Sequence, residues 1–236
     1  MHDTEQFEQQ PFGVVNDYTN LFHTTGAAPV LRALLKRAEA DHVPVVTPNV
    51  SHLLEMLVTL RQPRCILELG TAYGVSAYHM LKGLAAPATL VTIDLVRERQ
   101  AVAQEFLHDA GLDRHEIVFE CADFREEGYF ARLAERFAPF DLVFIDAAKG
   151  QYAHLLEEIV PHLSAQGAVV FDNIFLNGWL VADAYPNHRQ KTAFVRMKQF
   201  LQEVQQDARF AHTLLPLDDG VLVLARRQED RNETEH

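Results

Sequence analysis

Two carboxylates, an amide and a lysine follow two neighbouring apolar runs of this chain. Asp146 and Lys149 come directly after the run 141–145, and Asp172 and Asn173 come after the run 168–171. One strand–helix–strand unit separates the two aspartates, so adjacent parallel strands would bring them together. Carboxylate and amide oxygens suit a hard cation such as Mg²⁺ or Ca²⁺, with positions left for a substrate. Lys149 would then reach a hydroxyl bound there; the alternative is a pair of helix caps and a solvent-facing lysine.

A glycine-containing turn follows the first apolar run, 65–69. Gly70 and Gly74 let the backbone approach a ligand closely at the start of the next helix. Their spacing lacks the third glycine of the NAD fingerprint. Asp94, at the end of the next run, can accept hydrogen bonds from both hydroxyls of a ribose. Together they predict a nucleoside cofactor without a pyrophosphate, or else a simple turn and a helix-capping aspartate.

A third acidic position follows the run 117–119. We hypothesise that Asp123 accepts a hydrogen bond from an adenine amino group while Phe124 packs on the ring. The alternative interpretation is that Asp123 caps the next helix.

The elements that must position these residues alternate along the chain. Near-continuous apolar runs (65–69, 89–93, 117–119, 141–145, 168–171) are separated by segments of helical spacing such as 96–110 and 152–163. This pattern is typical of a parallel sheet that is covered on both faces. Helices are also expected over 30–40, 50–60 and 189–206, and the runs 210–215 and 220–225 form a hairpin.

The predicted fold is therefore α/β: a doubly wound, Rossmann-like, seven-stranded and mostly parallel sheet with one antiparallel strand in a C-terminal hairpin. We expect a single domain over 21–227, a polar acidic segment over 1–20 and a solvated tail over 228–236.

Composition excludes several classes of protein. The 236 residues carry a formal net charge of −12, which disfavours non-specific binding to nucleic acid or membranes. Two cysteines, Cys65 and Cys121, are too few for a disulfide scaffold or a cysteine-based zinc site. The polar N-terminus is unlike a signal peptide, and no uncharged stretch reaches the roughly 20 residues of a membrane span. We therefore expect a cytoplasmic protein without membrane association.

The residues above resemble a known family. The run 66–76, Asp94, the segment 144–152 and the pair Asp172-Asn173 are similar to the metal-dependent class I S-adenosylmethionine (SAM) O-methyltransferases of the catechol and caffeoyl-CoA type. The likeness extends over about 31–226. Within that family it is strongest to the bacterial branch that includes the tRNA 5-hydroxyuridine methyltransferase, on residues 42–44, 140–152, 178–183 and 216–224.

The resemblance implies a role for each matching position. One group would bind SAM: Glu68, Gly70, Ser76 and Val46 at the methionine end, Asp94 at the ribose, Ala122 and Asp123 at the adenine, and Asp146 near the amino group. A second group, Asp146, Asp172 and Asn173, would bind Mg²⁺, or Ca²⁺ or Mn²⁺ in its place. Lys149 matches the lysine proposed as general base. The sequence departs from the family pattern at 121–123, at Asp94 and at Trp179.

The implied reaction is O-methylation of a hydroxyl that lies next to a second chelating oxygen. The favoured methyl acceptor is 5-hydroxyuridine in tRNA, which would become 5-methoxyuridine. The alternative acceptor is a catechol-like or phenylpropanoid small molecule. Basic stretches without acids, at 189–198 and 21–38, could form a phosphate-binding surface if a homodimer merges them, or could simply be solvated helix faces. Phe175 and Trp179 could stack a splayed base or cover a phenolic ring. A nucleotide-binding module without catalysis is the rival of another class.

Overall fold

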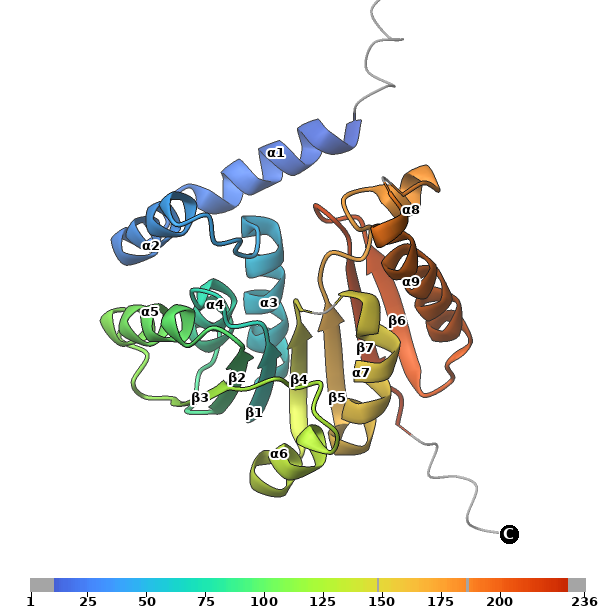
Figure 1. The fold of residues 1–236 in the computed structure, drawn as a ribbon. Coiled ribbons are helices and arrows are strands. Elements are labelled where there is room, and N and C mark those ends of the chain that lie inside the picture. Colours follow the sequence, from blue (N-terminus) through green and yellow to red (C-terminus); the bar gives the residue numbers. More distant parts are fainter. Residues whose placement is uncertain (1–10, 148, 186, 229–236) are drawn as a thin grey trace, which may run out of the picture.

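A seven-stranded sheet, in the order β3-β2-β1-β4-β5-β7-β6, forms the centre of the computed structural model, which describes residues 11–147, 149–185 and 187–228 (Figure 1). β7 is antiparallel to both of its neighbours and the other pairings are parallel, as the sequence predicted. The strands are β1 (Cys65–Leu69), β2 (Thr89–Asp94), β3 (Glu116–Cys121), β4 (Phe140–Ile145), β5 (Leu163–Phe171), β6 (Phe210–Leu215) and β7 (Val221–Arg226).

Helices cover both faces of this sheet, because successive side chains of a strand point to opposite sides. Cys65, Leu67 and Leu69 of β1 belong to one core, whereas Ile66 belongs to the other. The first core includes side chains of α6 (Tyr129–Phe137), α7 (Tyr152–Ile159) and α9 (His188–Gln206). The second includes side chains of α2 (Pro29–Ala40), α3 (Pro48–Arg61), α4 (Val75–Lys82) and α5 (Arg97–Asp109). Two 3₁₀ turns, η1 (Lys149–Gln151) and η2 (Val160–His162), and the short α8 (Trp179–Ala182) complete the order.

The N-terminal helix α1 (Pro11–Thr24) begins inside the segment that the sequence analysis set apart as 1–20. Asn20 ties it to the rest of the fold: its amide donates to Asp218 (2.8 Å), and its oxygen accepts from the backbone N–H of Asn49 (3.0 Å). The polar composition of 1–20 masked this helix in the sequence. In the structure, most of its apolar side chains are exposed to solvent. Residues 1–10 and most of the predicted tail, 229–236, lie outside the described residues, so the domain bounds stay a prediction.

Two element ends differ from the sequence prediction. β5 starts at Leu163 rather than near 168, and the helix predicted over 152–163 ends at Ile159 before turning through η2. Pro161 explains the second difference, since proline cannot donate the backbone hydrogen bond that would continue an α-helix. Among the described helices, none is long and apolar enough to cross a membrane.

Candidate functional site

The register of the sheet brings the predicted site residues to one level. Leu69 pairs with Ile93 on one side and with Ile145 on the other, and Ile145 pairs with Phe171. The residue after each of these therefore lies at the carboxyl edge of the sheet: Gly70, Asp146 and Asp172 follow their strands, and Asp94 is the last residue of β2, where it pairs with Cys121 of β3. In an open α/β sheet, ligands bind at this edge.

Gly70 allows the loops after β1 and β4 to approach each other. Its φ of +109° is one that side-chain-bearing residues rarely adopt, and a Cβ at this position would lie 2.8 Å from the Asp146 carbonyl oxygen. Only glycine fits this close contact.

Asp146 and Asp172 form the acidic part of this edge. Burial and, to a smaller extent, the charge of Asp146 raise the pKa of Asp172 to about 7. Burial likewise raises the pKa of Asp146 to about 6, against the opposing effect of Lys149. Both carboxyls therefore lack a partner that fully offsets the cost of ionisation.

Asn173 and Lys149 complete the group. The Lys149 ammonium donates a hydrogen bond to the Asn173 side-chain oxygen, and the Asn173 backbone N–H donates to Asp172 Oδ1 (2.7 Å). Asn173 has a positive φ of 55°, which asparagine tolerates better than most residues. The structure thus brings together the four residues that the sequence singled out after β4 and β5.

This donor set fits a hard divalent cation. The buried Asp172 carboxylate, the half-buried Asp146 carboxylate and an amide oxygen are ligands of the type that Mg²⁺ prefers. A cation would also offset the unfavourable proximity of the two negative charges, as the Lys149 ammonium does in part.

Glu68 and Ser76 face each other inside the turn between β1 and α4. Glu68 is fully buried and accepts hydrogen bonds from the hydroxyls of Ser76 (2.5 Å) and Thr92 (2.5 Å). Burial raises the pKa of Glu68 to about 7 in spite of these bonds. The contacts of both side chains position the glycine turn that follows β1.

Asp94 fastens the same turn to the end of β2. Its two carboxylate oxygens accept hydrogen bonds from the backbone N–H groups of Ala72 and Val96, both at 2.9 Å. Ala122 lies beside it, since its N–H donates to the Asp94 carbonyl oxygen (3.2 Å). Val46 is buried and borders a pocket next to Val75 at the start of α4.

The position after β3 differs from the hypothesis. The Asp123 carboxylate is held by the guanidinium of Arg125 (2.5 and 2.7 Å), which lowers its pKa to about 2. Asp123 is not the cap of α6, whose N-cap is Gly128. Phe124 is buried in the core beside Phe130, so its ring is not free to cover an adenine. The sequence analysis overlooked Arg125, although the Asp-x-Arg spacing was visible.

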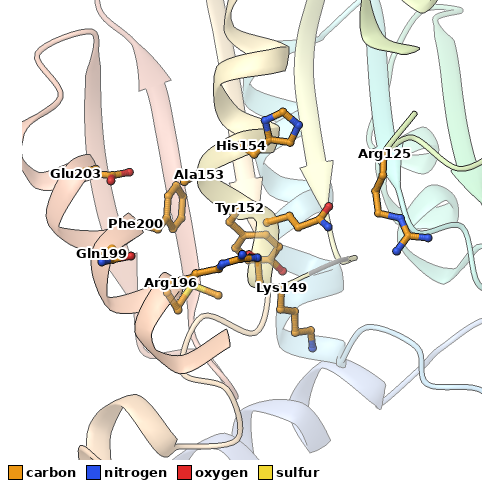
Figure 2. A pocket seen from close by; sticks show the side chains of 12 residues that line it. Arg125, Lys149, Tyr152, Ala153, His154, Arg196, Gln199, Phe200 and Glu203 are labelled. Atoms are coloured by element: carbon orange, nitrogen blue, oxygen red, sulfur yellow. The ribbon is translucent and has the colours of Figure 1, made fainter. Parts of the chain in front are cut away.

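A pocket of about 440 Å³ lies beside Lys149, between the η1–α7 segment and α9 (Figure 2). Arg125 and Arg196 border it together with Lys149. The side-chain oxygen of Gln151 is buried at this pocket without a hydrogen-bond partner in the described part of the chain. The pocket therefore presents three cationic side chains, the carboxylate of Glu203 and an unpartnered acceptor oxygen.

The loop after Asn173 packs its aromatic side chains inward. The Phe175 ring lies against Gly220, and both Phe175 and Trp179 pack against the core on the α7–α9 face. Leu176 and Asn177 have positive φ values of 54° and 58°. Both rings are partly buried, so each presents only part of its surface to solvent.

Comparison with known proteins identifies the relatives of this chain. The family model described as O-methyltransferase matches residues 26–228. A Mycolicibacterium vanbaalenii protein named "Putative O-methyltransferase" is 31% identical over 206 residues, which are 86% of this chain and 87% of that protein. Among solved structures, the O-methyltransferase from Bacillus cereus in complex with SAH has a TM-score of 0.75 at 21% identity, covering 91% of this chain and 97% of that one. The O-methyltransferase TomG from Streptomyces achromogenes, in complex with SAM, also has a TM-score of 0.75, at 23% identity over 96% and 99% of the two chains.

Proposed function

Because this chain belongs to the O-methyltransferase family, we propose that it uses SAM and a divalent cation to methylate a hydroxyl next to a second chelating oxygen. The observation that carries this proposal is the group of Asp146, Lys149, Asp172 and Asn173 at the carboxyl edge of β4 and β5. A module that only bound a nucleotide would have no need of this oxygen donor set, which argues against the non-catalytic rival.

SAM would lie across the ends of β1, β2 and β3. Gly70, whose missing side chain lets the loops after β1 and β4 meet, would lie at the methionine end, and Val46 would border the same end. Asp94 has lone pairs beyond the two that accept from Ala72 and Val96, and these would accept from the ribose hydroxyls. Solved relatives with bound SAM and SAH support this assignment.

The adenine end is assigned less directly to side chains. Ala122 would face the adenine from the end of β3. Asp123 would have to accept from the adenine amine while its carboxylate is paired with Arg125. We therefore propose that Asp123 accepts from the adenine amine while it remains paired with Arg125.

Asp146, Asp172 and Asn173 would hold the divalent cation, with Mg²⁺ as the expected ion. When bound, a divalent cation lowers the pKa of an adjacent hydroxyl and fixes its orientation. Asp146 would also accept a hydrogen bond from the amino group of SAM. These residues orient the acceptor so that its oxygen faces the sulfonium methyl group in line with the bond to sulfur.

Lys149 would take the proton. SAM would supply the methyl group, whose bond to sulfur would break with its electron pair left on sulfur as the acceptor oxygen bonds to the methyl carbon. The Lys149 nitrogen, which contacts the Asn173 side-chain oxygen, would accept the hydroxyl proton. Lysine suits this task because its amine can lose a proton, unlike a guanidinium.

The favoured acceptor is 5-hydroxyuridine in tRNA. Arg196, at the pocket beside Lys149, donates to the Gly150 carbonyl oxygen (3.3 Å) and has no carboxylate partner among the described residues. An unneutralised guanidinium there would suit a phosphate. Lys198 from the same basic stretch is less available, since it pairs with Asp183 at 2.6 Å. A catechol-like small molecule remains the second candidate, because it offers the same two adjacent oxygens.

Mass spectrometry of tRNA nucleosides tests the acceptor. A strain that lacks this protein is expected to lose 5-methoxyuridine and accumulate 5-hydroxyuridine. Unchanged 5-methoxyuridine would eliminate tRNA as the acceptor and leave the small molecule.

We also propose a homodimer in which α1 takes part. Five apolar side chains among the described residues of α1 are more than half exposed, and four of them form one stripe of the helix: Val14, Tyr18, Leu21 and Phe22. Exposed stripes of this kind mark interaction surfaces. Sedimentation velocity should give a dimer for the wild type and a monomer for a Tyr18→Glu, Leu21→Glu variant.

A further inference from the structure

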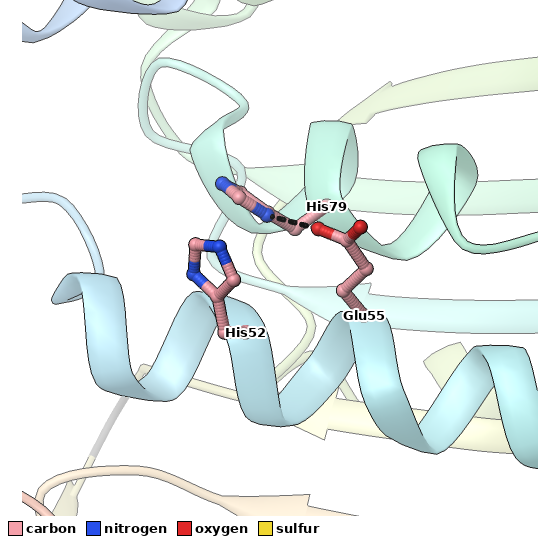
Figure 3. A group of neighbouring side chains, drawn as sticks. All are labelled: His52, Glu55 and His79. Carbon is pink, nitrogen blue, oxygen red and sulfur yellow. Dashed lines mark hydrogen bonds and ion pairs between the residues drawn. The ribbon is translucent and has the colours of Figure 1, made fainter. Parts of the chain in front are cut away.

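A second group of donor atoms lies between α3 and α4 and shares no residue with the site described above. His52 and Glu55 come from α3, and His79 comes from α4. One ligand atom of each residue lies within 4.8 Å of the other two. Figure 3 shows the two imidazole rings and the carboxylate turned toward one another.

Helix geometry and close packing hold this group in place. His52 and Glu55 are three residues apart, so they share one face of α3. Gly83, directly after α4, lets the two helices meet closely, since a Cβ there would lie 2.5 Å from Val58 Cγ2 and 2.7 Å from the Glu55 carbonyl oxygen. The donor atoms thus stand on two packed helices rather than on loops.

Hydrogen bonds orient both imidazoles. His52 Nδ1 lies 3.0 Å from the Pro48 carbonyl oxygen. A carbonyl oxygen only accepts, so Nδ1 carries the proton and Nε2 keeps a free lone pair. Metal-binding histidines usually donate their second nitrogen to a carbonyl or carboxylate in this way. His79 Nδ1 lies 2.8 Å from Glu55 Oε2, and this hydrogen bond fixes the orientation of the His79 ring beside the Glu55 carboxylate.

The group is sheltered but open on one side. The His79 side chain is only 5% exposed. His52 and His79 border a pocket of about 410 Å³, where the buried Ser51 hydroxyl has no hydrogen-bond partner within the described residues. His23 of α1 stacks on His52 with ring centroids 4.3 Å apart, and so closes the pocket from the other side. A further ligand from solvent would enter from this pocket.

One cation competes for the carboxylate. Lys82 Nζ lies 3.0 Å from Glu55 Oε1, but the Lys82 side chain is 49% exposed. It can turn into solvent with little loss, because an exposed ion pair contributes little to stability.

We propose that His52, Glu55 and His79 bind a divalent transition-metal ion, with Zn²⁺ as the representative, and that this ion fastens α3 to α4. Two imidazole nitrogens and one carboxylate are a known ligand set for Zn²⁺, which leaves its fourth position for water or another ligand. Mg²⁺ and Ca²⁺ prefer oxygen donors and do not suit this group.

Zinc retention by the full chain tests the proposal. Chelator-stripped protein is mixed with one equivalent of Zn²⁺ and passed through gel filtration, and the zinc that stays bound is counted. The wild type should keep about one ion per chain. His52→Ala and His79→Gln should weaken zinc binding by at least about 10–100-fold, the usual cost of losing even a supporting partner of a metal ligand.

Two control variants separate this site from other sites. Asp172→Ala removes a ligand of the proposed oxygen site and should leave zinc retention unchanged. His108→Ala removes a histidine that also lies beside a carboxylate, Asp113 at 3.0 Å, but that belongs to no group of three close ligand atoms among the described residues. It too should keep the zinc.

Thermal unfolding supplies a second measurement that does not depend on retention. Zn²⁺ should raise the Tm of the wild type and leave that of His52→Ala unchanged, because an ion that binds only the folded state stabilises it. His52 is partly exposed, so this variant is expected to fold even if His79→Gln does not. The proposal is overturned if the wild type keeps no zinc, if His52→Ala keeps as much as the wild type, or if Asp172→Ala loses it.

Discussion

The carboxyl edge of the sheet and the junction of α3 with α4 both gather donors for a cation, but they do so by different means. At the edge, Asp146 and Asp172 leave adjacent strands at the same level, so strand pairing alone sets their proximity. At the junction, His52 and His79 come from two helices whose approach depends on side-chain packing. Sheet topology thus brings together Asp146, Asp172 and Asn173, the proposed oxygen site. Helix packing brings together His52, Glu55 and His79, the proposed nitrogen site.

Burial has opposite effects on the pKa values of the two sites. It raises the pKa of Asp172 to about 7, whereas it lowers the pKa of His79, against the opposing effect of Glu55. In each case the neutral form gains, because a low-polarity environment disfavours charge. For the two aspartates, the cost of ionisation is one that a bound cation can remove. For a histidine, the favoured neutral form is the one that binds a metal.

Asp172→Ala should have the largest effect on catalysis. Loss of one of three protein ligands removes a carboxylate from a cation that binds only through oxygen, so turnover should fall below detection. The fold should persist, since the change also removes a buried charge next to Asp146. Methyl-transfer rates at limiting Mg²⁺ and far-ultraviolet circular dichroism measure the two effects.

His108→Ala is the matched control for that experiment, because it lies outside both sites. If Asp172→Ala turns over as fast as the wild type at limiting Mg²⁺, the ligand assignment at the edge of the sheet is wrong. The edge of the sheet would then not be a cation site that uses Asp172, and the contrast with the α3–α4 group would fail.

Lys149→Ala should lower kcat by about 10²–10⁴ with little change in SAM affinity, the usual range for a positioned general base. The loss should shrink at high pH, where hydroxide removes the acceptor proton without help. Lys149→Arg should not restore the rate, because guanidinium keeps its proton. A pH–rate series on both variants measures this.

Two other results would assign Lys149 differently. Rescue by arginine would mean that the residue acts only as a fixed positive charge beside the acceptor oxygen. A neutral alanine variant at every pH would make Lys149 a surface residue, and the cation alone would then activate the hydroxyl.

The strand ends explain how much of the oxygen site the sequence could predict. Apolar runs give the strand positions closely, and the residues just past them, such as Asp146 and Asp172, must lie at the same edge in a parallel sheet. The helical elements of the nitrogen site were partly predictable too, because His52 and Glu55 are three residues apart. What the sequence could not supply was the partner of α3, since the approach of α4 depends on tertiary contacts such as those at Gly83.

Side-chain pairing was the other feature that sequence reasoning missed. Asp123 was assigned to the cofactor, but Arg125 two residues away holds its carboxylate. Phe124 was assigned to the adenine ring, but its burial beside Phe130 shows that it is a core residue. Spacing along a chain does not show whether a neighbouring charge or the core claims a side chain.

Glu68→Gln should have the smallest effect on the fold, seen in the pH dependence of stability. Burial raises the pKa of Glu68 from 4.5 to about 7 in the folded protein. The folded state therefore binds the proton more tightly, and the wild type loses stability as pH rises from 4.5 through 7. The full difference is on the order of 3 kcal/mol, and glutamine removes it.

Urea unfolding at pH 5 and pH 8, with a chelator present, measures this effect. Asp146 and Asp172 titrate in both proteins, so the comparison isolates Glu68 together with the part of its raised pKa that the charge of Asp146 contributes. Equal pH dependence in the wild type and Glu68→Gln would show that Glu68 does not titrate in this range. Glu68 would then be a fixed hydrogen-bond acceptor for Ser76 and Thr92.

The most direct test of the central claim, that the oxygen donors at the edge of the sheet hold a catalytic cation, is the rate of methyl transfer from SAM to a catechol acceptor in EDTA and after Mg²⁺ is restored. We predict that EDTA abolishes turnover, that Mg²⁺ recovers it, and that calorimetric binding of SAM survives in both conditions because Gly70 and Asp94 are independent of the cation. Full activity in EDTA would contradict the account.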